Sequence, residues 1–245
     1  MKTFYLTDPG MVRSHNEDSV IVSKNENGEY LLAVADGMGG HKAGEVAAAI
    51  VTMYLGNAFS KIKSIGTKKE AAKWIEEAAT EINNNIFKYT DEVPESKGMG
   101  STLVICIFAK DFLIFGNIGD SSGYVLKNKK LHKVTNDHTL VNLLVTTGEL
   151  TEEDAKTHPK KNVLMKALGA NNPVEIDIFD VEREVDAVLL CSDGLSNMLS
   201  NDQIERTLCS KLNTDDTVIR LIQKANNRGG NDNISVAYLE TGTGE

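Results

Sequence analysis

The chain is short of cysteine, proline and long apolar runs, and these shortages exclude several classes of protein. Its three cysteines form no Cys-x-x-Cys pair, so no disulfide framework is expected and a reducing compartment is favoured. No run reaches the about 18 apolar residues that a membrane span needs, and the first ten residues lack the apolar core of a secretory signal. We therefore expect a cytoplasmic protein without a membrane partner.

Positive charge is also scarce, because 26 Lys and Arg face 35 Asp and Glu and leave a net charge of −9. Nucleic-acid binding depends on clustered Lys and Arg, so a nucleic-acid partner is not expected. An acidic chain is suited instead to holding cations. The 245 residues contain no internal repeat, linker or low-complexity tract, so one domain over residues 1–245 is the simplest organisation.

Most of the apolar runs are rich in β-branched and aromatic residues and are typical of strands. The predicted strands cover residues 18–25, 30–36, 101–109, 112–120, 122–128, 174–182, 186–194 and 233–240. Helical patterns cover 43–59 and 68–90, with weaker ones at 139–147, 201–209 and 215–227. Because many strands follow one another without an intervening helix, the pattern predicts an α+β fold with antiparallel sheets.

Acidic residues recur where predicted strands begin or end. They are Asp36 before Gly37, Asp193 before Gly194, Asp120 after a strand, and Glu17, Asp18 and Asp232 before strands. Any one of them alone is as easily a turn or cap residue. Their recurrence in distant parts of the chain, with no His or Cys at ligand spacing, favours a site for hard cations such as Mg²⁺ or Mn²⁺. More than one ion is expected.

Three other catalytic patterns are weaker. The segment GDSSG at 119–123 matches the nucleophile elbow of serine hydrolases with Ser121 as nucleophile, but a strand pattern follows it where a helix is required. His132, His138 and His158 are available as bases. No Gly-Lys dipeptide exists, which excludes a Walker-type phosphate loop, and no Cys is followed six residues later by Arg, which excludes a cysteine phosphatase.

Six motifs, in order, resemble the metal-dependent protein phosphatase family, type 2C. They are TDPGMVRSHNED (7–18), VADGMGGHKAGEVA (34–47), GSTLV (100–104), GNIGDSSGY (116–124), CSDGLSN (191–197) and NDNISV (231–236). The resemblance extends from Thr7 to Val236, and residues 137–169 resemble the flap of the bacterial branch, placed at about 140–168. It implies a β-sandwich of two antiparallel sheets flanked by helices, with a binuclear Mn²⁺ or Mg²⁺ centre at one end.

By motif position, the resemblance implies that Asp36 bridges the two ions and is catalytic, while the carbonyl of Gly37 binds one ion. Asp193, also catalytic, and Asp232 would complete the ligands of the first ion, and Glu17 would act through water on the second.

The remaining implied roles are auxiliary. A third, weaker ion would bind Asp120 together with Asp193, and Asp18 would support the inner site without binding metal directly. Arg13 matches the phosphate-binding arginine of the family, and its planar, permanently charged fork suits phosphate.

The implied activity is hydrolysis of phosphoserine and phosphothreonine in proteins by a metal-bridging hydroxide, reversing a bacterial Ser/Thr kinase, in a monomeric enzyme. Two departures stand out. Met38 replaces a histidine of eukaryotic relatives, so His41 is the nearest substitute for the general acid, and Lys161 stands where many bacterial members carry arginine. Two alternatives remain open: a catalytically silent module that reads phosphorylated partners, and a metal-dependent hydrolase of small phosphate esters or nucleotides.

Overall fold

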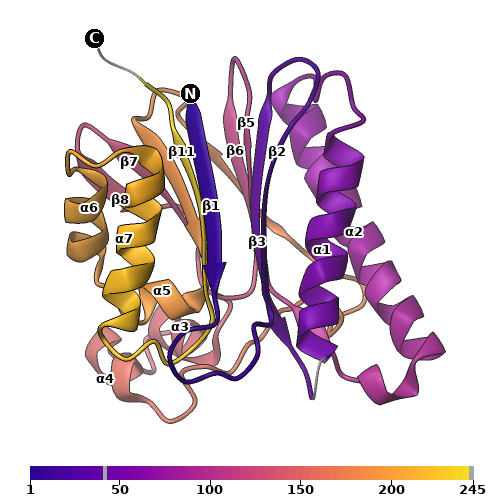
Figure 1. Cartoon of the computed structure of the whole chain (residues 1–245). Coiled ribbons are helices and arrows are strands. Elements are labelled where there is room, and N and C mark those ends of the chain that lie inside the picture. Colours follow the sequence, from indigo (N-terminus) through magenta and orange to yellow (C-terminus); the bar gives the residue numbers. More distant parts are fainter. Residues whose placement is uncertain (41–42, 243–245) are drawn as a thin grey trace.

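Two antiparallel β-sheets pack face to face in the computed structural model, which describes residues 1–40 and 43–242 (Figure 1). The first sheet has the order β1-β11-β10-β7-β8. Its strands are β1 (Lys2–Asp8), β11 (Ile234–Glu240), β10 (Ala187–Cys191), β7 (Ser122–Lys127) and β8 (Lys130–Lys133). The second sheet has the order β2-β3-β5-β6-β9, and the short β4 pairs with β3. Its strands are β2 (Asp18–Lys24), β3 (Tyr30–Met38), β4 (Gly100–Ser101), β5 (Leu103–Phe108), β6 (Leu113–Ile118) and β9 (Asp177–Val181).

Helices cover the outer face of each sheet and give a four-layer architecture (Figure 1). The helices are α1 (Ala43–Phe59), α2 (Lys68–Glu92), α3 (Leu140–Thr146), α4 (Glu152–Thr157), α5 (Asp193–Ser196), α6 (Asn201–Leu208) and α7 (Thr214–Asn226), with a 3₁₀ turn at Pro94–Ser96. Helices α1 and α2 pack on the second sheet, and α6 and α7 pack on the first. The predicted α+β sandwich flanked by helices is confirmed.

Strand β3 shows why its sequence is apolar without interruption. Leu31, Ala33 and Ala35 point toward α1 and α2, whereas Leu32 and Val34 point into the core between the two sheets. Because successive side chains of a strand face opposite sides, a strand covered on both faces needs apolar residues at every position. The apolar run therefore fixes β3 firmly within the sandwich, with Asp36 near its end.

The structure also differs from the predicted elements in several places. Strand β1 was not predicted, because its residues are half-exposed and the segment has no sustained apolar run. The predicted strand at 174–182 is shorter, since β9 covers Asp177–Val181, and Asp193 begins α5 rather than ending a strand. None of the helices in the described part of the chain has the length and apolar character that crossing a membrane requires.

Candidate metal centre

The acidic strand ends meet at one end of the sandwich. Asp18, at the start of β2, pairs directly with Asp36 near the end of β3. Asp193 follows β10, and Asp232 precedes β11, the antiparallel neighbour of β10. Asp120 follows β6, which runs antiparallel to β5 beside β3. Antiparallel neighbours therefore bring the end of one strand beside the start of the next, as the sequence pattern required.

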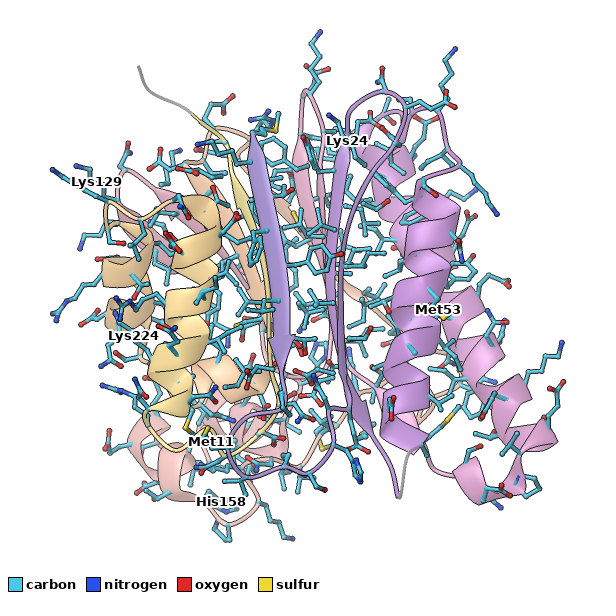
Figure 2. All side chains as sticks on the ribbon, in the orientation of Figure 1. Met11, Lys24, Met53, Lys129, His158 and Lys224 are labelled. Atoms are coloured by element: carbon cyan, nitrogen blue, oxygen red, sulfur yellow. The ribbon has the colours of Figure 1, made fainter. Side chains whose placement is uncertain are left out.

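A cleft of about 490 Å³ opens at this end and is lined by most of the predicted site residues. Its lining includes Arg13, Glu17, Asp36, Gly37, Asp120, Asp193 and Asp232. Asp18 is not part of the lining and lies below it with 9% of its surface exposed. Figure 2 shows Met11, in the β1–β2 loop, and His158, after α4, at this same end of the molecule, with Lys24 at the opposite end.

Mutual repulsion and burial make these carboxylates hard to ionise together. Burial and the charges of Asp18 and Asp193 raise the pKa of Asp36 well above its usual value. Burial and the charge of Asp193 raise the pKa of Asp120 to about 7. For Asp18, burial outweighs the hydrogen bonds from serines and raises the pKa to about 7. Such a cluster is unfavourable unless positive charge compensates it.

The donors that remain unused fit a hard divalent cation. Oδ1 of Asp18 and Oδ1 of Asp193 are buried and have no hydrogen-bond partner. Burial and Asp232 also raise the pKa of Asp193, to about 6. Oxygen donors with excess negative charge are the ligands that Mg²⁺ and Mn²⁺ prefer. No three His, Cys, Asp or Glu side chains of residues 1–40 and 43–242 converge closely enough to hold an ion as they stand.

Arg13 lies at the rim of the cleft and supplies part of the missing positive charge. Its guanidinium donates to Oδ2 of Asp232 at 2.8 Å, and about half of the arginine side chain is exposed. Both groups are therefore accessible to solvent and to a ligand. A surface ion pair of this kind contributes little to stability, so Arg13 can exchange Asp232 for an incoming anion at small cost.

Gly37 is required by close backbone packing. A Cβ at this position would lie 2.0 Å from the carbonyl oxygen of Gly44 and 2.5 Å from that of Glu17. The amide of Gly37 also donates to the Glu17 carbonyl at 3.0 Å. Strand β3 continues to Met38, so Asp36 and Gly37 lie within the strand and not in a turn. The Asp36 backbone is therefore held on both sides, by β2 and by Thr102.

Thr102, between β4 and β5, binds the Asp36 backbone directly, and Ser121 contacts only Thr102. The Asp36 amide donates to Oγ1 of Thr102 at 2.9 Å, and the Thr102 amide donates to the Asp36 carbonyl at 2.9 Å. Oγ1 of Thr102 lies 2.8 Å from Oγ of Ser121, which is completely buried. Ser121 is followed by strand β7, so the geometry of a nucleophile elbow is absent at this position.

Asn233 organises the loop that carries Arg13 and Glu17, a role that sequence reasoning missed. Its side-chain nitrogen donates to the carbonyls of Pro9 and His15 at 3.0 and 2.9 Å. Its Oδ1 accepts the amide of Glu17 at 2.8 Å. One buried amide therefore joins both ends of this loop to the start of β11. The only signal in the sequence is its position directly after Asp232.

The other predicted residues have varied placements. Met38 lines the cleft and offers no proton to a leaving group. His41 lies outside the described residues. Lys161 lines a second, larger hollow of about 1110 Å³, bordered by α3, α4 and α6, which shares Asp120 and Asp193 with the first. The expected flap therefore lies next to the acidic cleft.

Comparisons with known proteins agree with this arrangement. The family model "Protein phosphatase 2C" matches residues 12–234. The chain is 42% identical over 241 residues to the serine/threonine phosphatase stp of Listeria welshimeri, covering 98% of this chain and 96% of that protein. It is 36% identical over 240 residues to the protein phosphatase PhpP of Streptococcus pneumoniae, covering 98% and 97%.

Solved structures give the same result. The S. agalactiae serine/threonine phosphatase superposes with a TM-score of 0.91 at 37% identity, covering 97% of this chain and 98% of that one. The serine/threonine phosphatase PstP/Ppp of Mycobacterium tuberculosis superposes with a TM-score of 0.83 at 33% identity, covering 98% of each chain.

Proposed function

The chain belongs to the protein phosphatase 2C family, and we propose that its acidic cleft holds divalent ions for the hydrolysis of phosphoserine and phosphothreonine in proteins. Of the relatives named above, PhpP is named a protein phosphatase and the other three are named serine/threonine phosphatases, so the coarse activity follows from membership. The observation that carries the finer proposal is the meeting of Asp36, Asp120, Asp193 and Asp232 in one cleft beside Arg13.

The residues that would hold two ions, Mn²⁺ or Mg²⁺, are Asp36, the carbonyl of Gly37, Asp193 and Asp232, with Glu17 acting through water. A third ion would fall to Asp120 together with Asp193. The buried, unpartnered Oδ1 of Asp193 and the raised pKa values of Asp36 and Asp193 support this assignment. When bound, such ions supply an activated water and neutralise the phosphoryl oxygens.

The protein's own groups have separate tasks in this proposal. Arg13 leaves Asp232 and holds the phosphate by charge-assisted hydrogen bonds. Asp18, fixed by the 2.7 Å bond from Ser192, keeps negative charge beneath the ions without touching substrate. Since Met38 offers no proton, His41 is the proposed general acid for the leaving alkoxide.

Substrate and setting complete the proposal. One catalytic domain over residues 1–245 would act as a monomer on proteins phosphorylated by a bacterial Ser/Thr kinase, with the flap at about 140–168 bordering the cleft. Relatives from Listeria and Streptococcus carry the phosphatase name, which supports action on phosphorylated proteins. Three free thiols, at Cys106, Cys191 and Cys209, are consistent with a cytoplasmic setting.

Hydrolysis of p-nitrophenyl phosphate by the purified protein, with Mn²⁺ and with EDTA, tests the activity. Asp36→Ala and Asp193→Ala should each abolish turnover because each removes a carboxylate from the centre of the cleft. Ser121→Ala should retain turnover, since Ser121 is buried and cannot act as a nucleophile. Absence of Mn²⁺-stimulated hydrolysis in the wild type would reject the proposal, and Mn²⁺ binding without turnover would favour a silent phosphoprotein-binding module.

A further inference from the structure

His138 lies where the Asp120 loop, the end of the flap and strand β9 meet. Its backbone amide donates to the carbonyl of Gly119 at 2.9 Å, and its carbonyl accepts the amide of Met165 at 2.8 Å. Its ring lies 3.1 Å from the Gly119 amide through Nδ1 and 3.0 Å from Oδ2 of Asp177 through Nε2. All four polar groups of the residue are thus used, and the side chain is only 10% exposed.

The partners assign one tautomer to the ring. The Gly119 amide is a donor, so Nδ1 must accept and carries no proton. Nε2 then carries the proton and donates it to the Asp177 carboxylate. Asp177 also accepts a hydrogen bond from Nζ of Lys166 at 3.3 Å, and Lys166 lines the acidic cleft. The ring is therefore fixed in orientation and in hydrogen position.

Gly119 is the residue directly before Asp120, and it is held on two sides. Its φ of +104° lies in the left-handed region, and a Cβ would lie 2.6 Å from Cγ2 of Thr102. Thr102 therefore closes one side of Gly119, while His138 binds its amide and its carbonyl on the other. Because the peptide before Asp120 cannot rotate freely, these two neighbours fix the backbone from which the Asp120 side chain extends.

His138 joins this loop to the end of the flap. Met165, whose amide binds the His138 carbonyl, lines the same cleft as Asp120. Leu164 pairs with Thr139 in an isolated bridge, so the chain returns from the flap directly beside His138. A displacement of either segment would break a hydrogen bond to the same residue.

We propose that His138 is a positioning residue, which aims Asp120 into the cleft through Nδ1 and the Gly119 amide and ties that loop to the end of the flap. The inference rests on the proposed function, since it gives Asp120 a ligand role. His138 contacts neither substrate nor ion. Its contribution is to present Asp120 already oriented, so that ion binding does not have to order the loop.

Two substitutions separate positioning from general packing. The Oδ1 atom of asparagine stands near the place of Nδ1, so His138→Asn keeps an acceptor for the Gly119 amide and loses Asp177. The longer glutamine side chain reaches toward the place of Nε2, so His138→Gln keeps a contact to Asp177 and leaves the amide unpaired. Both remove the ring, and the smaller asparagine leaves the larger void, so a packing role predicts that His138→Asn is at least as damaging as His138→Gln. His132→Gln, at an exposed position of β8, is the control.

The Mn²⁺ concentration for half-maximal hydrolysis of p-nitrophenyl phosphate is the first readout. His138→Gln should raise it about ten- to a hundredfold, the usual cost of losing a partner that orients a metal ligand. His138→Asn and the control should stay within about threefold of the wild type. Equal shifts for the two His138 variants, or no shift for His138→Gln, would overturn the proposal.

Two further readouts do not depend on activity. Calorimetric titration with Mn²⁺ should show weaker binding for His138→Gln than for His138→Asn, even if the wild type hydrolyses no phosphate ester. In that case the proposed function fails while the positioning role stands. Imidazole ¹⁵N shifts of the wild type should show a protonated Nε2 and an unprotonated Nδ1 for His138. The opposite tautomer would overturn the proposal even if neither variant folds.

Discussion

Replacement of Asp18 by asparagine should stabilise the metal-free protein and weaken its response to divalent ions. Asp18 is buried beneath the cleft, where Oδ2 accepts the hydroxyl of Ser192 at 2.7 Å and Oδ1 has no partner. Asparagine is nearly the same size and keeps an oxygen for Ser192. It removes the negative charge that has no internal compensation.

The expected gain in unfolding free energy follows from the raised pKa of Asp18. Burial, opposed by the serine hydrogen bonds, raises the pKa of Asp18 from 3.8 to about 7. A carboxyl whose pKa is higher in the folded state holds its proton longer there, so the folded state loses stability as pH rises from about 4 to about 7. About three pKa units at 1.36 kcal/mol each correspond to about 4 kcal/mol of unfolding free energy at pH 8. The difference shrinks to about 1 kcal/mol at pH 4.5.

Urea unfolding in EDTA at pH 8 and pH 4.5 measures this difference. Asp18→Asn should be the more stable protein at pH 8 and gain much less at pH 4.5, whereas Mn²⁺ should stabilise the wild type more than the variant. Asp91→Asn, at an exposed position of α2, is the control and should change stability by less than about 0.5 kcal/mol. A variant less stable than the wild type at pH 8 in EDTA would show that the buried charge of Asp18 does not destabilise the metal-free protein.

Three further outcomes are expected. Arg13→Ala should lower kcat/KM for p-nitrophenyl phosphate about ten- to a hundredfold, the cost of a charged hydrogen bond of about 1.5–3 kcal/mol, with little change in the urea midpoint. Asn233→Asp should lower activity and stability together because it loses the donors to two loop carbonyls, whereas Asn25→Asp, at the opposite end of β2, should cost stability alone. Equal activity losses in Asn233→Asp and Asn25→Asp would contradict the role of Asn233 in holding the loop that carries Arg13 and Glu17. Burial raises the pKa of Glu29, but four hydrogen bonds outweigh it and lower the pKa below its usual value. Urea unfolding should therefore show that Glu29→Gln is less stable than the wild type at pH 7, and that the difference disappears as the pH falls through the lowered pKa.

The apolar runs and the acids at their ends could be predicted because each is a local pattern. A strand buried on both faces, such as β3, must be apolar throughout, and an aspartate at its end is visible in the sequence. Strand β1 could not be predicted in this way. It lies at the edge of its sheet, and its residues are half-exposed. Its strand conformation therefore depends on pairing with β11, which is not visible in the local sequence.

The supporting residues could not be predicted because their roles depend on distant segments. Asn233 binds carbonyls more than 200 positions away, and His138, between β8 and α3, binds Asp177 at the start of β9. Gly37 lies within β3, where the carbonyl of Gly44 leaves no space for a side chain. In each case the contact exists only after the sheets have formed.

The proposed metal centre at the acidic end of the sandwich is built around Asp36. Diffraction from crystals soaked in Mn²⁺, recorded at a wavelength where manganese scatters anomalously, would locate the ions. We expect at least two anomalous peaks in the cleft, with the Asp36 carboxylate between them and Asp193 and Asp232 beside one of them. A map with no peak beside Asp36, at a Mn²⁺ concentration that supports full turnover, would contradict the proposal.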